Sequence, residues 1–292
     1  MFEKILIANR GEIARRVART CRRMGIVPVG VYSEADANAA YLGDMAQSVC
    51  LGPAAPAQSY LHIARIIEAA RQCACQAIHP GYGFLSENAE FAAAVEDAGL
   101  VFIGPSPQVI RLLGDKAQAK QRMQQAGVPT VPGTPEATED LDRLQALAEE
   151  AGLPILLKPS AGGGGKGMQV VRDMGQLALV GEQAIRLARA NFGDGRLIVE
   201  RYIERPRHIE VQIMGDGQGQ AVHLFERECS LQRRHQKVLE EAPATELTPQ
   251  VRERLLAAAV QGARAVSYRN AGTFEFIVDP TGDFFFLEVN TR

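Results

Sequence analysis

A run of four glycines, residues 162–165, stands between Lys158 and Lys166. Glycine lacks a Cβ atom, so the backbone N–H groups of such a loop can approach an anion closely. The two lysines add positive charge at either end. Short apolar runs at 153–157 and 168–171 predict a strand on each side of the loop. These residues indicate a phosphate-binding hairpin, and the alternative is a plain flexible surface hairpin.

The loop differs from two other phosphate-binding motifs. A Walker loop ends in Gly-Lys followed by Ser or Thr, whose hydroxyl holds a metal, but here Gly167 follows Lys166. No helix follows at once, as a dinucleotide-binding fingerprint would require. A glycine-rich hairpin that closes over its ligand fits the sequence better.

A second set of candidate groups lies near the end of the chain. Glu275 sits between two phenylalanines in the apolar run 273–278, and Glu288 and Asn290 lie two residues apart in the run 284–290. The Asp-Pro-Thr-Gly turn between the runs predicts a β-hairpin. Two carboxylates and an amide oxygen are the ligands that Mg²⁺ or Mn²⁺ prefers. The alternative is a strand face with polar residues turned to solvent.

Lys116 follows Asp115, which can cap a helix that ends at Gly127. A lysine in the first turn is unfavourable to the helix dipole unless an anion neutralises it. A bound phosphate would do so, and a solvated lysine is the alternative.

The run 226–237 is dense in cationic and hydrogen-bonding side chains. Such a run is usually a solvated loop. Here Gln232, His235 and Lys237 could instead donate hydrogen bonds to ribose, phosphate or a small oxyanion. No Ser/His/Asp or Cys/His arrangement for nucleophilic catalysis stands out.

Strand and helix signals alternate over residues 1 to about 110, which predicts a parallel sheet covered on both faces. Prolines and a glycine at 129–135 mark a linker. After the linker, a small α+β unit of about 75 residues includes the glycine-rich hairpin, and its size suits a lid. From His208 the pattern becomes antiparallel, with His208, Glu210 and Gln212 on one strand face.

The formal net charge of −2 gives no electrostatic reason to expect nucleic acid or a membrane surface as a partner. The N-terminus lacks the apolar core of a signal peptide, and no apolar run approaches the roughly 20 residues of a membrane span. We therefore expect a cytoplasmic protein. The five cysteines lack metal-site spacing, and we expect them to be reduced packing residues.

Seven motifs in this order resemble those of the biotin carboxylase component of biotin-dependent carboxylases, which are ATP-grasp enzymes. They span nearly the whole chain: IANRGEIA (7–14), AIHPGYGFLSEN (77–88), GDK (114–116), AGGGGKGM (161–168), CSLQRRHQK (229–237), GTFEF (272–276) and EVNTR (288–292). The resemblance implies an α/β and α+β fold. A Rossmann-like domain at 1–113 would precede an ATP-grasp domain at 114–292, with a lid at about 130–204 and an incomplete antiparallel sheet at 205–292.

The resemblance also implies residue roles. ATP phosphates would be held by Lys116, Lys158, Lys166 and the loop Gly163, Gly164, Gly165 and Gly167. Adenine would meet Glu200 and the backbone near Tyr202 and Ile203, and the nucleotide site would be lined by His208, Gln232 and His235. Metal would be bound by Glu275, Glu288 and Asn290, and Lys237 and Arg292 would face bicarbonate.

In this family ATP phosphorylates bicarbonate, and the carboxyphosphate then carboxylates a ring nitrogen of biotin. The expected ligands are thus ATP, Mg²⁺ or Mn²⁺, bicarbonate and biotin on a carrier protein, within an acyl-CoA carboxylase of the acetyl-CoA or propionyl-CoA type. A carboxyltransferase subunit is an expected partner, and family members often form homodimers. The family continues well past the position of Arg292, so we expect an N-terminal portion that binds nucleotide without full turnover.

Two other functions stay open at this point. Another ATP-grasp ligase, of the carbamoyl-phosphate synthase type, would share the glycine-rich loop and the metal hairpin. A non-catalytic ATP-binding fragment would be stabilised by nucleotide without chemistry.

Overall fold

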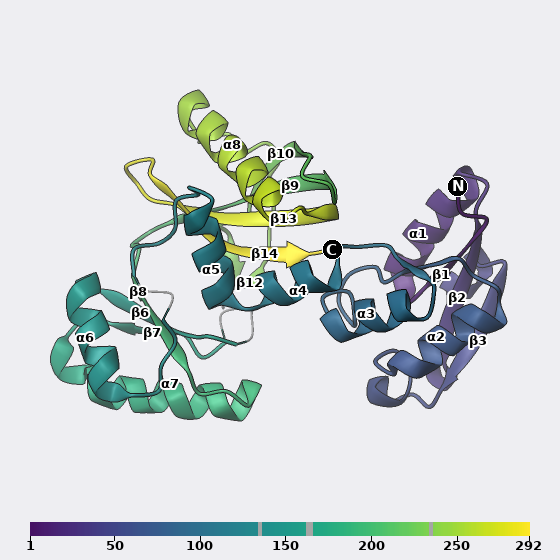
Figure 1. Cartoon of the computed structure of the whole chain (residues 1–292), viewed down its shortest axis with the longest axis horizontal. Coiled ribbons are helices and arrows are strands. Elements are labelled where there is room, and N and C mark those ends of the chain that lie inside the picture. Colours follow the sequence, from purple (N-terminus) through teal and green to yellow (C-terminus); the bar gives the residue numbers. More distant parts are fainter. Residues whose placement is uncertain (134–135, 162–165, 234–235) are drawn as a thin grey trace. The chain divides into compact units, whose positions relative to one another are not determined.

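The computed structural model describes residues 1–133, 136–161, 166–233 and 236–292. The chain forms two compact units. The first unit comprises Met1–Arg111, Arg269–Ala271 and Thr291–Arg292, and the second comprises Leu112–Tyr268 and Gly272–Asn290. Figure 1 labels the helices and strands of both units.

The first unit is built on a five-stranded parallel sheet with the strand order β3-β2-β1-β4-β5. Its strands are β1 (Lys4–Ile7), β2 (Val27–Ser33), β3 (Gln47–Gly52), β4 (Ala77–His79) and β5 (Val101–Phe102). The predicted parallel α/β sheet is therefore confirmed.

Helices cover both faces of this sheet because successive residues of a strand point to opposite sides. Leu6 of β1 belongs to a core with α2 (Ile63–Gln72) and α3 (Ala89–Asp97). Ile5 and Ile7 belong to a second core with α1 (Gly11–Arg23). Short 3₁₀ turns lie at η1 (Glu34–Asp36), η2 (Ala40–Asp44) and η3 (Pro56–Gln58), and α4 (Pro107–Gly114) runs across the boundary between the units.

The second unit contains a three-stranded antiparallel sheet, in the order β7-β6-β8. Its strands are β6 (Ile155–Pro159), β7 (Gln169–Val171) and β8 (Leu197–Arg201), and α6 (Leu141–Ala151), η4 (Met174–Gln176) and α7 (Leu177–Phe192) accompany them. Leucines of α6 share one apolar core with Ile155, Leu157 and Val199 of the sheet. The predicted hairpin around the glycine-rich loop is confirmed as β6 and β7.

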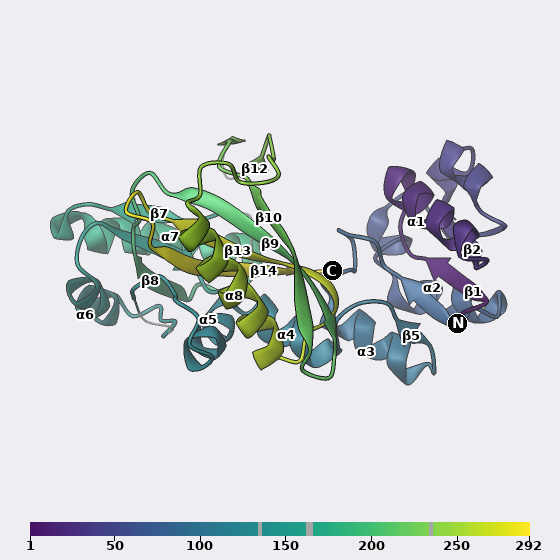
Figure 2. The same cartoon turned by 90° about the horizontal axis from the view of Figure 1, so that it is seen from above.

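A four-stranded sheet in the order β10-β9-β13-β14 forms the rest of the second unit. Its strands are β9 (Arg207–Asp216), β10 (Ala221–Glu228), β13 (Arg269–Val278) and β14 (Phe284–Thr291), and β11 (Gln232–Arg233) pairs with β12 (Gln236–Lys237). Helix α8 (Pro249–Ala265) packs on β9 and β10, as Figure 2 shows from above. The predicted hairpin of residues 273–290 is confirmed as β13 and β14.

Side-chain caps fix where three helices begin. The Asp115 carboxylate accepts from Gln118 N at 3.0 Å and starts α5 (Lys116–Gln125). Ser106 and Thr248 accept in the same way, each at 3.3 Å, at the starts of α4 and α8. The Asp115 cap was predicted, and all three follow from the ability of Ser, Thr and Asp side chains to satisfy N–H groups that a helix start leaves unpaired.

The cysteine prediction is confirmed in part. All five cysteines are free, and Cys21, Cys75 and Cys229 are buried. It was wrong for Cys50, which lies exposed on the edge strand β3. In the part of the chain that the structure describes, no helix combines the length and the apolar character of a membrane span.

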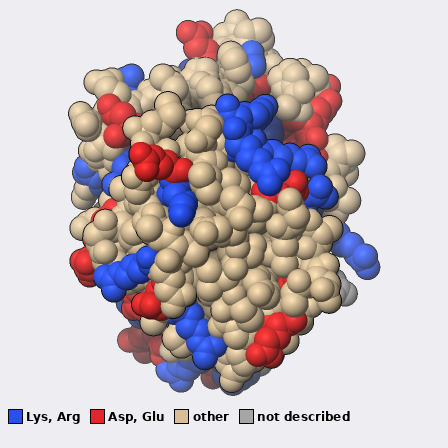
Figure 3. Space-filling view, turned by 90° about the vertical axis from the view of Figure 1, so that its right-hand side faces the viewer, with Lys and Arg blue, Asp and Glu red and all other residues tan. Residues whose placement is uncertain are grey.

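Arginines dominate one exposed side of α1. Arg16, Arg19, Arg22 and Arg23 line a hollow in its surface. Figure 3 faces the first unit and shows a group of Lys and Arg side chains on the upper part of that face.

Candidate nucleotide-binding site

A cluster of lysines surrounds one buried carboxylate in the second unit. Lys116 and Lys120 lie one turn apart on α5, which places them on the same face of the helix. Lys158 stands near the end of β6, and Glu200 lies on β8 diagonally across the strand pair. Lys120 Nζ is 3.0 Å from Glu200 Oε1, and Lys158 Nζ contacts Oε2.

Three of these groups are almost closed to solvent, and Lys116 is half-buried. Lys120 is 4% exposed, and Lys158 and Glu200 are each 7% exposed. Burial alone would raise the pKa of Glu200, but Lys158 and Lys120 outweigh it and lower that pKa. Burial lowers the pKa of Lys116, and the nearby Glu288 carboxylate counteracts part of this shift.

The charges in this cluster do not balance. Three ammonium groups meet the carboxylates of Glu200 and Glu288, so one positive charge is left in a largely buried place. A buried charge without a partner is costly. A polyphosphate would supply the missing negative charge, which makes this cluster a candidate phosphate site.

The glycine-rich loop begins four positions after Lys158. Gly163, Gly164 and Gly165 lie outside the described residues, so their contact with phosphate stays a prediction. Lys166 is exposed. Gly167 has φ +79°, and a Cβ atom there would lie 3.1 Å from Pro159 Cγ, so this position favours glycine.

A second cluster forms around Glu275, on the strand β13. His208 Nε2 lies 2.6 Å from Glu275 Oε2, and Lys237 Nζ lies 2.8 Å from Oε1. Asn290 Nδ2 of β14 also donates to Oε1. Gln232 Nε2 lies 2.6 Å from His208 Nδ1, so a Gln232 donor leaves the Nε2 proton of His208 to donate to Glu275.

The protonation states in this cluster follow from its contacts. Burial would raise the pKa of Glu275, but His208 and Lys237 outweigh it and lower the pKa to about 2. Burial would lower the pKa of Lys237, but Glu275 and Glu210 raise it above its ordinary value. Lys237 is therefore a fixed cation at neutral pH, suited to hold an anion rather than to accept a proton.

Glu210 is a functional candidate that the sequence analysis left out of the site. It is 4% exposed, its Oε1 lies 2.5 Å from Arg227 Nε, and its Oε2 contacts Lys237. Its place between His208 and Gln212 on one strand face was the available signal. Glu210 thus holds Lys237 from one side while Glu275 holds it from the other.

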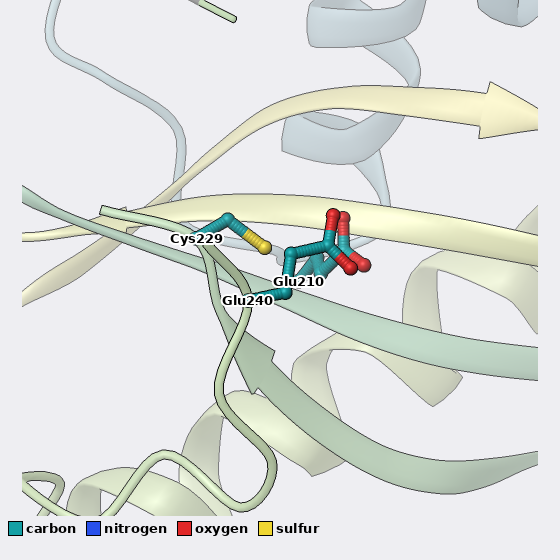
Figure 4. A group of neighbouring side chains, drawn as sticks. All are labelled: Glu210, Cys229 and Glu240. Atoms are coloured by element: carbon teal, nitrogen blue, oxygen red, sulfur yellow. The ribbon is translucent and has the colours of Figure 1, made fainter. Parts of the chain in front are cut away.

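Figure 4 shows Glu210 beside Cys229 and Glu240, with one ligand atom of each within 4.8 Å of the others. Both oxygens of Glu210 already face cations. Burial raises the pKa of the Cys229 thiol to about 12, so it stays protonated at neutral pH. We assign no metal to this group, because cysteine binds a metal as a thiolate and the Cys229 thiol is protonated.

The three predicted metal ligands fit a hard cation. Glu275, Glu288 and Asn290 lie on the neighbouring strands β13 and β14. A carboxylate offers about four acceptor positions, and the three donors on Glu275 leave one of them. The side chain of Glu288, on β14, makes no hydrogen bond or ion pair with the residues that the structure describes, so its oxygens can take a cation.

The remaining predicted residues lie in different places. Tyr202 N donates to Pro154 O at 2.8 Å, and Arg172 lies over the Tyr202 ring. Ile203 is half-buried beside it. His235 lies outside the described residues. Arg292 belongs to the first unit, where its Nη1 lies 2.5 Å from Glu87 Oε1.

Comparison with known proteins gives two family matches. Residues 1–110 match a family described as "Biotin carboxylase, N-terminal domain". Residues 115–292 match one described as "Carbamoyl-phosphate synthase L chain, ATP binding domain".

Three relatives illustrate the similarity. The biotin carboxylase of Pseudomonas aeruginosa is 50% identical over 293 residues, which cover 100% of this chain and 65% of that protein. A solved biotin carboxylase complex with β-γ-ATP from Campylobacter jejuni is 49% identical with a TM-score of 0.96, covering 100% of this chain and 66% of that one. The solved biotin carboxylase domain dimer of Hydrogenobacter thermophilus 2-oxoglutarate carboxylase, with MgADP, ADP and bicarbonate, is 46% identical with a TM-score of 0.94, covering 100% and 64%.

The chain thus spans less than two thirds of the length of these relatives. The match to the solved biotin carboxylase confirms the predicted α/β and α+β fold class. Taken together, the family matches and the relatives show that the chain belongs to the biotin carboxylase family, with a biotin carboxylase N-terminal domain followed by an ATP-grasp ATP-binding domain.

Proposed function

We propose that this chain binds Mg·ATP in its second unit and serves the ATP- and bicarbonate-dependent carboxylation of biotin on a carrier protein. The observation that carries the proposal is the excess of positive charge that Lys116, Lys120 and Lys158 form beside the carboxylates of Glu200 and Glu288. Such a cluster beside a glycine-rich loop suits the phosphates of a nucleotide.

The solved relatives support this assignment of ligands. The Campylobacter jejuni structure is a complex with β-γ-ATP, and the Hydrogenobacter thermophilus structure holds MgADP and bicarbonate. At 49% and 46% identity over the whole of this chain, the same ligand classes are the natural candidates here.

Magnesium held by Glu288, Glu275 and Asn290 would neutralise charge on the phosphates during phosphoryl transfer. Lys116 and Lys158 would bind the phosphate oxygens directly. Because Lys158 is buried and Lys116 is half-buried, their attraction for phosphate is stronger than it would be in water.

The proposed reaction has two steps. An oxygen of bicarbonate attacks the γ-phosphorus of ATP, ADP leaves, and carboxyphosphate forms. The carboxyl group then passes to a biotin ring nitrogen, and the proton of that nitrogen leaves with inorganic phosphate. Lys237, held as a cation by Glu210 and Glu275, would bind the anionic bicarbonate and keep it in place for attack.

Partners follow from the same proposal. A biotin carrier protein or domain would bring the biotin, and a carboxyltransferase would take the carboxyl group onward. We propose an acyl-CoA as the final acceptor, although a 2-oxoglutarate carboxylase is among the relatives. A homodimer is proposed because that relative's domain is described as a dimer.

An enzyme of the carbamoyl-phosphate synthase type is the second candidate, because the family that matches residues 115–292 carries that name. The test is ATP cleavage with Mg²⁺ and bicarbonate, measured with biotin, with ammonia and with neither. Stimulation by biotin alone supports the proposed function, and stimulation by ammonia alone supports the second candidate. Nucleotide binding without cleavage under any condition would indicate a binding module.

A further inference from the structure

Lys120 is a buried cation to which the proposed function gives no direct contact with phosphate. It lies on α5 one turn after Lys116, and 4% of its surface is exposed. Its neighbours on the buried face of the helix, Ala119 and Met123, are apolar. Burial lowers the pKa of Lys120, and Glu200 opposes that shift. Removing the charge of a lysine from water is costly, so a buried lysine must gain a compensating interaction.

The Glu200 carboxylate forms an ion pair with a lysine at each of its two oxygens. Lys120 Nζ donates to Oε1 at 3.0 Å with hydrogen-bond geometry. Lys158 Nζ contacts Oε2, yet Oε2 has no hydrogen-bond partner among the described residues, so that ion pair is not a well-aligned hydrogen bond. One carboxylate needs one counter-charge, so one of the two lysines is surplus.

The positions of the two lysines show which one can leave. Lys120 lies in the middle of a helix, and Glu200 is the partner that the structure gives it. Lys158 is the penultimate residue of β6, close to where that strand ends. A phosphate bound near Lys158 would therefore compete with Glu200 for its ammonium group.

We propose that Lys120 is a positioning residue that keeps Glu200 neutralised, so that Lys158 can move from Glu200 to a nucleotide phosphate. The inference deepens the proposed function and rests on it. Without Lys120, the transfer of Lys158 would leave a buried carboxylate unpaired, and phosphate binding would bear that cost. Lys120 thus acts through Glu200 and Lys158 and need not touch the ligand.

The test compares nucleotides with and without phosphate. Isothermal calorimetry would give the dissociation constants of Mg·ATP and of adenosine for the whole chain and for Lys120→Met. We expect ATP affinity to fall at least tenfold in Lys120→Met while adenosine affinity changes less than threefold. Adenosine has no phosphate, so its binding does not require Lys158 to leave Glu200. An equal loss for both ligands, or no loss for either, overturns the inference.

Second-site changes separate an indirect role from direct contact. The preference for ATP over adenosine is the ratio of the adenosine dissociation constant to that of Mg·ATP. Glu200→Gln removes the charge that holds Lys158, so the double variant Lys120→Met/Glu200→Gln should regain most of this ATP-over-adenosine preference. Lys116→Met, which removes a proposed direct phosphate contact, should not regain it when combined with Glu200→Gln. If Lys120→Met behaves like Lys116→Met in this respect, Lys120 contacts phosphate itself and the inference is wrong.

Two further variants guard against a folding defect. Lys120→Arg keeps the charge and should keep the ATP-over-adenosine preference. Glu200→Gln alone should leave that preference unchanged or higher, and a lower preference overturns the inference even if Lys120→Met does not fold. Absence of ATP binding by the unchanged chain overturns the proposed function and this inference with it, whereas ATP binding with an unaltered preference in Lys120→Met overturns the inference alone.

Discussion

Glu275 receives donors from His208, Lys237 and Asn290, which belong to different strands of the second unit. It is only 2% exposed, so its charge is stable only because these donors replace water. The same carboxylate also restrains Lys237, which we place against bicarbonate. One residue therefore links the proposed metal position to the proposed anion position.

This environment predicts a loss of stability in acid. The pKa of Glu275 is about 2 in the folded chain, against an ordinary value of 4.5, so the unfolded chain takes up a proton first as the pH falls. Folding free energy from this group is fully present above pH 4.5 and is lost between pH 4.5 and 2, in total about 3 kcal/mol. Urea unfolding of the wild-type chain and Glu275→Gln at several pH values would measure it. Identical pH dependence of the two proteins would contradict this environment for Glu275.

Glu288 predicts a dependence on magnesium. Glu288→Gln keeps the shape of the side chain but removes the charge that would attract Mg²⁺, so the gain in ADP affinity on adding Mg²⁺ should shrink at least several-fold. Titrations of ADP with and without Mg²⁺ would show this. Glu240→Gln, an exposed change in the group of Figure 4, is the matched control and should keep the full gain. The opposite pattern would move the metal to Glu210, Cys229 and Glu240.

Motif residues could be predicted from the sequence, but their supporting residues could not. Lys158, Glu275 and Glu288 stand in motifs with unusual composition. Lys120 stands in a polar helix where a lysine normally faces solvent, and its partner Glu200 is 80 positions away. The sequence does not reveal this ion pair, because Lys120 and Glu200 meet only when the fold brings α5 and β8 together.

At the scale of elements, the hairpin of β13 and β14 alternates core residues with site residues. Phe274 and Phe276 are fully buried on either side of Glu275. The Phe276 ring packs edge-on against the rings of Phe284 and Phe286. Because side chains alternate across a strand, this aromatic layer turns Glu275 toward the opposite face.

The aromatic layer predicts a large effect of truncation. Phe276→Ala would leave a cavity beside Phe284 and Phe286 and should lower the free energy of unfolding by about 3–5 kcal/mol. Phe276→Leu fills more of the space and should cost clearly less. Urea denaturation followed by circular dichroism measures both. A similar small loss in both variants would contradict close packing of this layer.

Most elements could be predicted because their signals are local. Period-two alternation predicted β9, and the Asp-Pro-Thr-Gly turn predicted the β13–β14 hairpin. Asp115 predicted the start of α5. The register shift in β10 between His223 and Glu226 could not be predicted. Phe225 lies there with φ +63°, a conformation that the sequence gives no reason to expect.

At the scale of the whole molecule, the chain forms two units, and the proposed nucleotide site lies in the second. The parallel sheet of the first unit was predictable from the strand and helix signals that alternate over residues 1 to about 110. The antiparallel pairing of β9 with β10 in the second unit was predictable from the period-two alternation that begins at His208. The return of residues 269–271 and 291–292 to the first unit was not, because it depends on tertiary contacts. Arg269 illustrates this, since its Nη2 lies 2.8 Å from Glu96 Oε1, far away in the sequence.

Nucleotide should protect one unit more than the other. We expect Mg·ATP to slow amide hydrogen exchange in α5, β6, β8 and β14, because a ligand that binds the folded state alone stabilises it, by about 2.7 kcal/mol at 100 times its dissociation constant. Strands β1, β2 and β3 should exchange at unchanged rates. Mass spectrometry of exchanged peptides would map the effect. Protection confined to the first unit would contradict the proposed site.

Calorimetric titration of Mg·ATP into the wild-type chain and Lys116→Met tests most directly whether the half-buried Lys116 and the buried Lys158 bind the phosphates of ATP. We predict one ATP per chain, with affinity lowered at least tenfold in Lys116→Met, since a charge-assisted contact contributes about 1.5–3 kcal/mol. Equal affinity in the two proteins, or no binding by the wild-type chain at millimolar ATP, would contradict the account.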